Sequence, residues 1–239
     1  MPINDRIKVL LFGGGPVHDY QGICSVLQEY LEEDVRFSVE LVIEDYDVFL
    51  PDRINAYDLV VLYHTSGTLT PVQVGGLTQW VASGHGIVGV HSAADSFKSN
   101  PEYIAMLGGV FRGHPAVRRF IVSLVDPVPG EESIENHMTH PITAAMEGYT
   151  KKNWEQWPIF EYEVEDEQYL LEMASSVDVL ANTLFRGRAC PIAWTRSWGE
   201  GRVFYLALGH DVNACRFPFF KSIFLQGSRW GGGMIQNDE

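Results

Sequence analysis

Histidine is the residue type whose positions in this sequence point most directly to chemistry. The chain has eight histidines, and four of them follow apolar runs or lie beside glycine-rich turns: His18, His91, His114 and His210. A neutral imidazole can act as a general base, carry a proton or bind zinc and similar divalent metals. These four positions predict a shared site, with zinc or another divalent metal as the candidate cofactor. The other histidines are interpreted as structural or exposed: His64, His85, His137 and His140.

Acidic residues offer these histidines a partner. Four glutamates occupy alternate positions in one stretch, which places them on one face if the stretch is a strand: Glu161, Glu163, Glu165 and Glu167. We expect one of them to turn inward, where its carboxylate could serve as a base. The spacing alone leaves open which glutamate does so.

A run of three glycines, residues 13–15, comes shortly before His18 and Asp19. It fits neither the dinucleotide pattern GxGxxG nor the phosphate-loop pattern ending in GK[ST], so no nucleotide cofactor is expected. We interpret the run as a turn in which the chain passes close to its neighbours. The backbone amides around Gly14 are then expected to face a ligand crevice, which also makes Asp19 a candidate for substrate binding.

His91 stands at the position that a serine or cysteine occupies in a nucleophile elbow. The sequence Gly89-Val-His-Ser-Ala93 lies at a predicted strand-to-helix junction, but the second glycine of the elbow pattern is replaced by Ala93. Ser92 is one residue out of register for nucleophilic attack. We interpret Ser92 as a helix cap and keep it as a candidate for substrate binding.

The first half of the sequence alternates apolar runs with helical patterns. Strands are predicted at residues 6–12, 37–43, 57–63 and 87–91, and helices at residues 21–31 and 70–83. Near-continuous apolar strands separated by helices indicate parallel βαβ units that are covered on both faces. The predicted fold is therefore a doubly wound, mostly parallel α/β sheet. Its ligand site lies beyond the carboxyl ends of the strands, at residues 13–19, 63–66 and 91–95.

The pattern changes after residue 116. Further strands are predicted at residues 117–125, 161–172, 177–182, 191–195 and 202–207, and a last helix at residues 218–230. We expect a single domain over residues 1–230 with an insertion at about residues 126–160. Residues 231–239 are expected to form a flexible tail.

Composition excludes several classes of partner and compartment. The 17 Lys and Arg against 31 Asp and Glu give a formal net charge of −14, so neither nucleic acid nor a membrane surface is expected as a partner. The apolar runs are shorter than the roughly 18 residues of a spanning helix, and the first residues lack the apolar core of a signal peptide. A cytoplasmic location is expected. The three cysteines form no even framework and are expected to be reduced and mostly buried.

Seven motifs taken together resemble the ThuA-like, trehalose-utilisation family. They are Gly13-Gly-Gly…His18-Asp19, Gly86-Ile-Val-Gly-Val-His-Ser-Ala93, Leu107-Gly-Gly-Val-Phe-Arg-Gly-His-Pro115, His140-Pro-Ile-Thr143, Asp166-Glu-Gln-Tyr169, Ala193-Trp-Thr-Arg196, and Gly199-Glu-Gly-Arg-Val-Phe-Tyr205 with Leu208-Gly-His210. The resemblance covers nearly the whole chain. It implies a flavodoxin-like sheet of the class I glutamine amidotransferase type without the amidotransferase cysteine. It also implies a role in carbohydrate utilisation.

The resemblance selects the recurring polar positions of the family. In this sequence they are His18, His91, His114, Glu167 and His210. The expected catalytic residues are His91, Glu167 and His18, and the expected metal ligands are His18, His91, His114 and His210. The segment between His140 and Asp166 is longer than the family pattern. It contains Trp154 and Trp157, whose rings could stack on the apolar faces of a sugar or pack in the core.

The expected function is a carbohydrate-utilisation enzyme acting on a sugar or keto-sugar. A base such as His91 or Glu167 would remove a proton beside a carbonyl or from a hydroxyl, and another histidine or a metal would stabilise the oxyanion. Lyase, isomerase and hydrolase reactions share this first step. Two alternatives stay open, a non-catalytic sugar-binding or regulatory domain and a structural subunit of a sugar oxidoreductase system. A homo-oligomer is compatible with each of them.

We predict that the protein has no glutaminase activity, because His91 stands where the amidotransferase cysteine would act and the three cysteines lie elsewhere. The measurement is ammonia release from glutamine, expected at background with and without iodoacetamide. Glutamine-dependent ammonia release that iodoacetamide abolishes would contradict this prediction.

Overall fold

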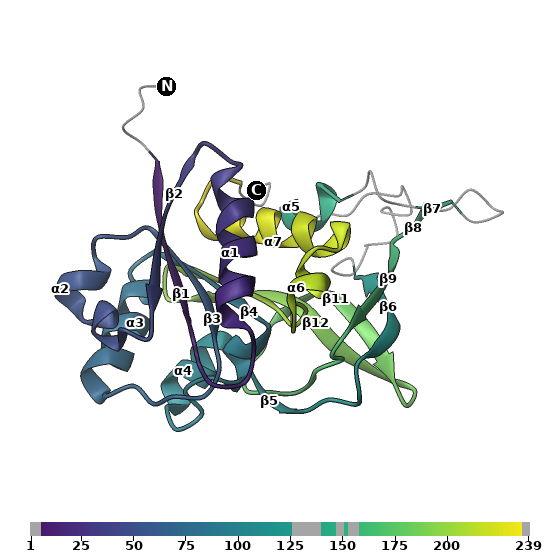
Figure 1. Ribbon diagram of the computed structural model, residues 1–239, viewed down its shortest axis with the longest axis horizontal. Coiled ribbons are helices and arrows are strands. Elements are labelled where there is room, and N and C mark those ends of the chain that lie inside the picture. The colour runs from purple at the N-terminus through teal and green to yellow at the C-terminus, as the bar shows by residue number, and fades with distance from the viewer. Residues whose placement is uncertain (1–5, 126–139, 147–150, 153–157, 236–239) are drawn as a thin grey trace.

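A nine-stranded sheet forms the centre of the computed structural model, which describes residues 6–125, 140–146, 151–152 and 158–235 (Figure 1). The strand order is β2-β1-β3-β4-β13-β12-β11-β6-β9. Helices pack on the sheet, so the prediction of an α/β protein with a large central sheet is confirmed. None of the described helices is both long enough and apolar enough to cross a membrane.

One half of the sheet is parallel. Its strands in spatial order are β2 (Phe37–Ile43), β1 (Ile7–Gly14), β3 (Leu59–His64), β4 (Gly86–Val90) and β13 (Gly201–Leu206). Every residue of β3 and β4 is buried, as expected for strands that helices cover on both faces. The carboxyl ends of these strands meet at one edge of the sheet, which makes that edge the expected place for a ligand site.

The other half of the sheet is antiparallel. It consists of β12 (Arg188–Trp198), β11 (Asp178–Phe185), β6 (Arg118–Leu124) and β9 (Glu161–Asp166). Two small antiparallel pairs accompany it, β5 (Gly109–Gly113) with β10 (Leu170–Met173) and β7 (Lys151–Lys152) with β8 (Pro158–Ile159). The sheet is therefore mixed, and the predicted parallel order describes only its first five strands.

The single strand predicted at residues 161–172 is wrong, because the chain forms β9 and β10 in two different sheets. The break falls at residues 167–169. There the buried carboxylate of Asp166 accepts hydrogen bonds from the amides of Glu167 and Gly209. These bonds end the strand, so the side chains after Asp166 no longer alternate between the two faces of the sheet. This break carries Glu167 away from the face that the other glutamates occupy.

Helices cover both faces of the sheet. The longer ones are α1 (Tyr20–Glu32), α3 (Pro71–Ala82), α4 (Pro101–Leu107) and α7 (Pro218–Gly231). The shorter ones are η1 (Tyr46–Phe49), α2 (Pro51–Ile54), η2 (His91–Asp95), α5 (Pro141–Ala144) and α6 (Val212–Cys215). As expected, α3 begins at the cap Thr70, which exchanges hydrogen bonds with Gln73, and at Pro71.

Two consecutive residues of β13 show how the long helices are distributed. Phe204 and Tyr205 point to opposite faces, because side chains alternate along a strand. A Cβ built on Gly227 of α7 would lie 2.1 Å from the ring of Phe204. On the other face, the ring of Trp194 lies 4.3 Å from that of Tyr205 and its Nε1 donates to the carbonyl of Leu107 in α4 at 2.9 Å. Helix α7, with α1, therefore covers one face, and α4, with α3, covers the other.

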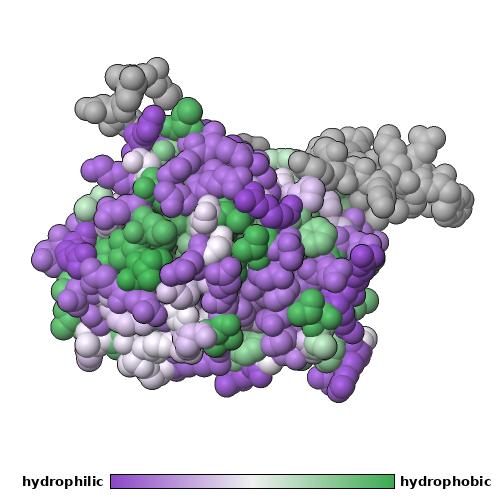
Figure 2. Space-filling view, in the orientation of Figure 1, coloured by the Kyte–Doolittle hydropathy of each residue, from purple (hydrophilic) through white to green (hydrophobic). Residues whose placement is uncertain are grey.

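The face drawn in Figure 2 is mostly hydrophilic, in keeping with the strong negative charge of the sequence. Figure 2 shows the apolar side chains of the drawn face in separate patches, the largest on the side of β2. Leu41 and Ile43 of this edge strand are exposed. Residues 232–235, which the sequence places in a tail, turn back on α7, and Met234 and Ile235 pack against the core.

We predict opposite effects for two adjacent glycines of α3. A Cβ on Gly76 would lie 2.1 Å from the carbonyl oxygen of Phe49, whereas a Cβ on Gly75 would have only the side chain of Gln79 nearby, at 3.8 Å. Gly75→Ala should stabilise the fold by about 0.5–1 kcal/mol, because alanine favours a helix. Gly76→Ala should destabilise it by about 1–3 kcal/mol, because the backbone must move. Denaturant unfolding of both variants measures the difference, and equal effects would contradict the packing described.

Candidate active site

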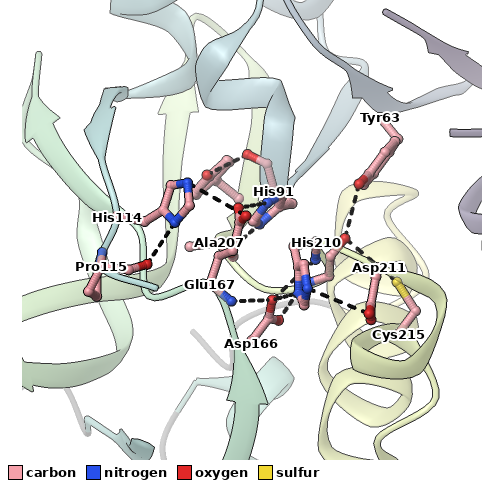
Figure 3. A network of polar contacts seen from close by, with 12 residues as sticks. Tyr63, His91, His114, Pro115, Asp166, Glu167, Ala207, His210, Asp211 and Cys215 are labelled. Atoms are coloured by element: carbon pink, nitrogen blue, oxygen red, sulfur yellow. Dashed lines mark hydrogen bonds and ion pairs between the residues drawn. The ribbon is translucent and has the colours of Figure 1, made fainter. Parts of the chain in front are cut away.

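The predicted site residues converge at the carboxyl edge of the parallel strands. Their positions follow β1, β4, β5, β9 and β13, in the order His18, His91, His114, Glu167 and His210. Figure 3 shows His91, His114 and Glu167 directed toward one another, with Asp166 and His210 beside them. The two halves of the sheet therefore contribute to one cluster.

His91 is held in a strained and fully buried position. Its φ of 44° is a left-handed conformation that few side chains adopt, and it stands at the turn from β4 into η2. The hydroxyl of Tyr205 donates to the carbonyl of His91 at 2.7 Å, and the ring of Tyr169 packs 3.9 Å from its imidazole. The predicted strand-to-helix junction is present, and His91 stands where a nucleophile elbow would carry its nucleophile.

The tautomer of His91 follows from its partners. Nδ1 lies 2.8 Å from the carbonyl oxygen of Ala207 and must donate to it, because a carbonyl only accepts. In the neutral ring, Nε2 then carries a lone pair, yet it faces Oε2 of Glu167 at 3.3 Å. Two acceptors facing each other need a positive charge to be satisfied, either a second proton on the ring or a bound cation.

His114 repeats this arrangement on the other side of Glu167. Its Nδ1 donates to the carbonyl of Pro115 at 2.8 Å, and its Nε2 lies 3.5 Å from Oε1 of Glu167. Burial raises the pKa of Glu167, but the hydrogen bond with His91 and the charges of the histidines around it hold the pKa below its usual value. Glu167 is therefore a carboxylate with one histidine at each oxygen.

His18 completes a group with the donor set of a metal site. A ring nitrogen of His18, a ring nitrogen of His91 and a carboxylate oxygen of Glu167 lie within 4.8 Å of one another. Burial and, to a smaller extent, the neighbouring His91 lower the pKa of His18 to about 4, so its ring is neutral at physiological pH. Two neutral imidazoles and one carboxylate form a ligand set typical of catalytic zinc.

Asp166 fixes the remaining histidine. Its carboxylate is buried and accepts hydrogen bonds from the amides of Glu167 and Gly209, both at 2.7 Å, and from the amide of His210 at 3.2 Å. Nδ1 of His210 donates to the same carboxylate at 2.5 Å. Burial lowers the pKa of His210, but the hydrogen bond and charge of Asp166 outweigh it and raise the pKa above the usual value.

Some expected site residues have other roles. Asp19 is exposed and caps α1 by accepting the amide of Gly22 at 3.0 Å. Ser92 is buried inside η2, which begins at His91 and has Val90 before it, so its interpretation as a helix cap is wrong. His114 and His210 lie beside the three-residue metal group and are not members of it. Trp154, Trp157 and His137 lie outside the described residues.

The glycine run makes the close approach expected of it. A Cβ on Gly15, whose φ is 98°, would lie 2.3 Å from the carbonyl oxygen of Thr65. The amide of Gly15 donates to Oε1 of Glu44 at 3.0 Å. This amide was expected to face a ligand, and in the structure it is bonded to a carboxylate of the protein itself. Gly14 ends β1 beside His64.

The other described histidines have structural partners. His64 bonds the hydroxyls of Tyr46 and Ser96, His85 stacks on Trp80, and His140 caps α5. Burial lowers the pKa of His64 and of His140 to about 4.

Two important residues were not singled out from the sequence. They are Asp166, whose carboxylate bonds His210, and Tyr169, whose ring packs between the rings of His91 and Phe111. Both belong to the motif Asp166-Glu-Gln-Tyr169, which was the available signal. On the exposed face of β9, the other three glutamates stay in solvent: Glu161, Glu163 and Glu165.

We predict that Asp166→Asn lowers the pKa of His210, because the amide removes the negative charge that favours the imidazolium. The measurement is a histidine NMR titration. In the unaltered protein His210 should titrate above the usual 6.5, whereas His18 should stay neutral to about pH 4. His64, which bonds Tyr46 and Ser96, serves as the control that should not respond. An unchanged titration of His210 would show that Asp166 does not set its charge.

Comparisons with known proteins agree on the kind of fold. The ThuA family model, described as trehalose utilisation, matches residues 8–231, and no curated protein matches the chain. A ThuA-like protein from Parabacteroides merdae has a TM-score of 0.77 at 20% identity, covering 98% of this chain and 92% of its own. One from Bacteroides uniformis has a TM-score of 0.69 at 17% identity, with coverages of 95% and 91%. A β-galactosidase from Bacillus circulans has a TM-score of 0.58 at 12% identity, covering 95% of this chain and 31% of its own.

At these identities the solved structures show the fold alone. The family match is of a different kind, because it is made on sequence and leaves out only the two ends of the 239 residues. The matched range includes all five converging residues: His18, His91, His114, Glu167 and His210. The chain therefore belongs to the ThuA family, which is described as trehalose utilisation.

Proposed function

We propose that this protein is a metal-assisted enzyme that acts on a sugar or keto-sugar by acid–base chemistry. The observation that carries the proposal is the convergence of His18, His91 and Glu167, with donor atoms within 4.8 Å of one another. The family supplies the class of substrate. We also infer a variant of the flavodoxin-like, class I glutamine amidotransferase-like fold, which the order of the five parallel strands supports.

The surroundings of the three donors favour a metal over a simple ion pair. His91 donates its Nδ1–H to the carbonyl of Ala207, which is the kind of outer hydrogen bond that orients metal-binding histidines. The low pKa of His18 keeps its lone pair available. A cation between His91 and Glu167 would also satisfy the two acceptors that face each other. Zinc is the first candidate, because three protein ligands leave it a position for substrate or water.

The metal, His114 and His210 would each have a different role in the reaction. A metal in this position supplies polarisation of a carbonyl or hydroxyl oxygen of the substrate. His114 has a partly exposed ring whose Nδ1–H is fixed by Pro115, so its Nε2, 3.5 Å from Oε1 of Glu167, carries the lone pair that would accept a proton from the substrate. His210, with its raised pKa, can donate a hydrogen bond to an oxygen that gains negative charge.

We predict about one zinc ion per chain in the protein prepared without chelator. His18→Asn and Glu167→Gln should each weaken zinc binding at least 100-fold, because each removes one of three ligands. His114→Asn is the matched control, since it changes a neighbouring histidine outside the metal group and should bind zinc normally. Calorimetry and elemental analysis measure binding. Absence of zinc, together with no thermal shift on adding zinc or manganese, would contradict the metal centre.

A turnover screen tests the reaction itself. We predict that a pool of keto-sugars and disaccharides contains a substrate whose turnover falls about 10² to 10⁴-fold in His114→Asn, as for the loss of a general base. Retention of zinc by this variant would separate proton transfer from metal binding. Sugar binding without turnover of any pooled compound, in the presence of zinc or manganese, would instead favour a non-catalytic sugar-binding domain.

A further inference from the structure

His91 is held at two points, and both contacts come from the same stretch of chain. The hydroxyl of Tyr205 donates to the backbone carbonyl of His91 at 2.7 Å, and Nδ1 of His91 donates to the carbonyl of Ala207 at 2.8 Å. Tyr205 lies in β13, and Ala207 directly follows that strand. The end of β13 therefore holds both the backbone and the ring of one proposed metal ligand.

The backbone of His91 needs such a contact. Its φ of 44° costs free energy in a residue that carries a side chain, so the surrounding structure has to maintain this conformation. His91 is also fully buried, and a buried carbonyl without a donor is costly. The phenol of Tyr205 meets both needs, because it satisfies the carbonyl and fixes the peptide group next to the strained residue.

Tyr205 itself has little freedom to move. β13 runs parallel to β4, with Tyr205 beside Gly89. A Cβ on Gly89 would lie 3.1 Å from Cδ2 of Tyr205, so the absence of a side chain there makes room for the ring. The ring of Trp194 packs 4.3 Å away, and Tyr205 is wholly buried. A firmly packed ring thus carries the hydroxyl to a fixed point beside His91.

Tyr103 makes a closely similar bond that does not involve a site residue. Its hydroxyl donates to the carbonyl of Ala93 at 2.8 Å, and Tyr103 is 1% exposed. Ala93 and His91 both belong to η2, but Ala93 has no polar side chain to offer to the site. If the two tyrosine hydroxyls served stability alone, their removal would have equivalent effects.

We propose that Tyr205 is a positioning residue, whose hydroxyl holds His91 in place and thereby strengthens metal binding by the group of His18, His91 and Glu167. The inference rests on the proposed function and assigns part of the metal affinity to a residue that does not touch the metal. Without the hydroxyl the strained backbone can relax, and metal binding would have to restore it. The loss of an outer hydrogen bond that orients a ligand typically weakens metal binding about 10 to 100-fold.

The test compares Tyr205→Phe with Tyr103→Phe, because each removes one buried hydroxyl. The Kd of zinc is measured by calorimetry on protein freed of metal. We expect Tyr205→Phe to weaken zinc binding about 10-fold or more, and Tyr103→Phe to leave it close to that of the unaltered protein. Both variants should lower the melting temperature of the metal-free protein to a similar extent, because each leaves a buried carbonyl without its donor.

A second measurement follows His91 in the absence of metal. Exchange of its Nδ1 proton with water, observed by NMR, should be faster in Tyr205→Phe and unchanged in Tyr103→Phe, because the bond to Ala207 protects this proton only while the ring is held. If Tyr205→Phe does not fold, 4-aminophenylalanine in place of Tyr205 keeps a weaker donor on the same ring. It should still weaken zinc binding, whereas 4-aminophenylalanine in place of Tyr103 should not.

The outcomes that would overturn the inference are distinct. Equal zinc affinity in the Tyr205 and Tyr103 variants, or unchanged proton exchange of His91 in Tyr205→Phe, would show that Tyr205 is only structural, and the proposed function would stand. If the unaltered protein binds no zinc, the proposed metal centre fails and this inference fails with it.

Discussion

The carboxylate of Asp166 joins the two halves of the sheet. It lies at the end of β9 and accepts hydrogen bonds from the amides of Gly209 and His210, which follow β13. In the strand order β9 is four positions from β13, and in a flat sheet such strands would lie roughly 19 Å apart at about 4.8 Å a strand. The sheet must therefore curl until its antiparallel edge returns to the parallel half.

The hydrogen bonds that Asp166 accepts also offset the free-energy cost of burying its charge. A buried charge is expensive unless several donors satisfy it, and Asp166 has three amides and one imidazole as donors. These contacts decide where Glu167 and His210 lie, because the amides of both residues donate to this carboxylate. The site at His91 depends on this closure, since Glu167 comes from the far edge of the sheet.

Sequence patterns were sufficient where local rules apply. The four parallel strands of the first half, the capped helix α3 and the convergence of histidines at strand ends follow from apolar runs, capping residues and the geometry of parallel sheets. The break of the predicted strand after Asp166 could not be found in this way, because its cause is a partner more than 40 residues away.

The roles of single site residues depend on the same kind of distant contact. The tautomer of His91 is set by the carbonyl of Ala207, and no spacing in the sequence identifies such an acceptor. The choice of Glu167 among four alternating glutamates came from the family motif. Its physical reason, that it is the first residue beyond the end of β9, is visible only in the structure. Ser92 was misassigned because η2 starts at His91, two residues before the start that a cap at Ser92 would give.

The buried histidines link the fold to proton uptake. In His18, His64 and His140 burial lowers the folded pKa to about 4 from a usual 6.5. Between these two pH values the three histidines bind protons in the unfolded chain but not in the folded chain. Unfolding is therefore favoured as the pH falls from 6.5 toward 4. His210 acts in the opposite direction, because its raised pKa lets the folded chain bind a proton first. Acid therefore weakens the fold over the same pH range in which it would protonate a free histidine, whereas His18 in the folded chain keeps its lone pair down to about pH 4.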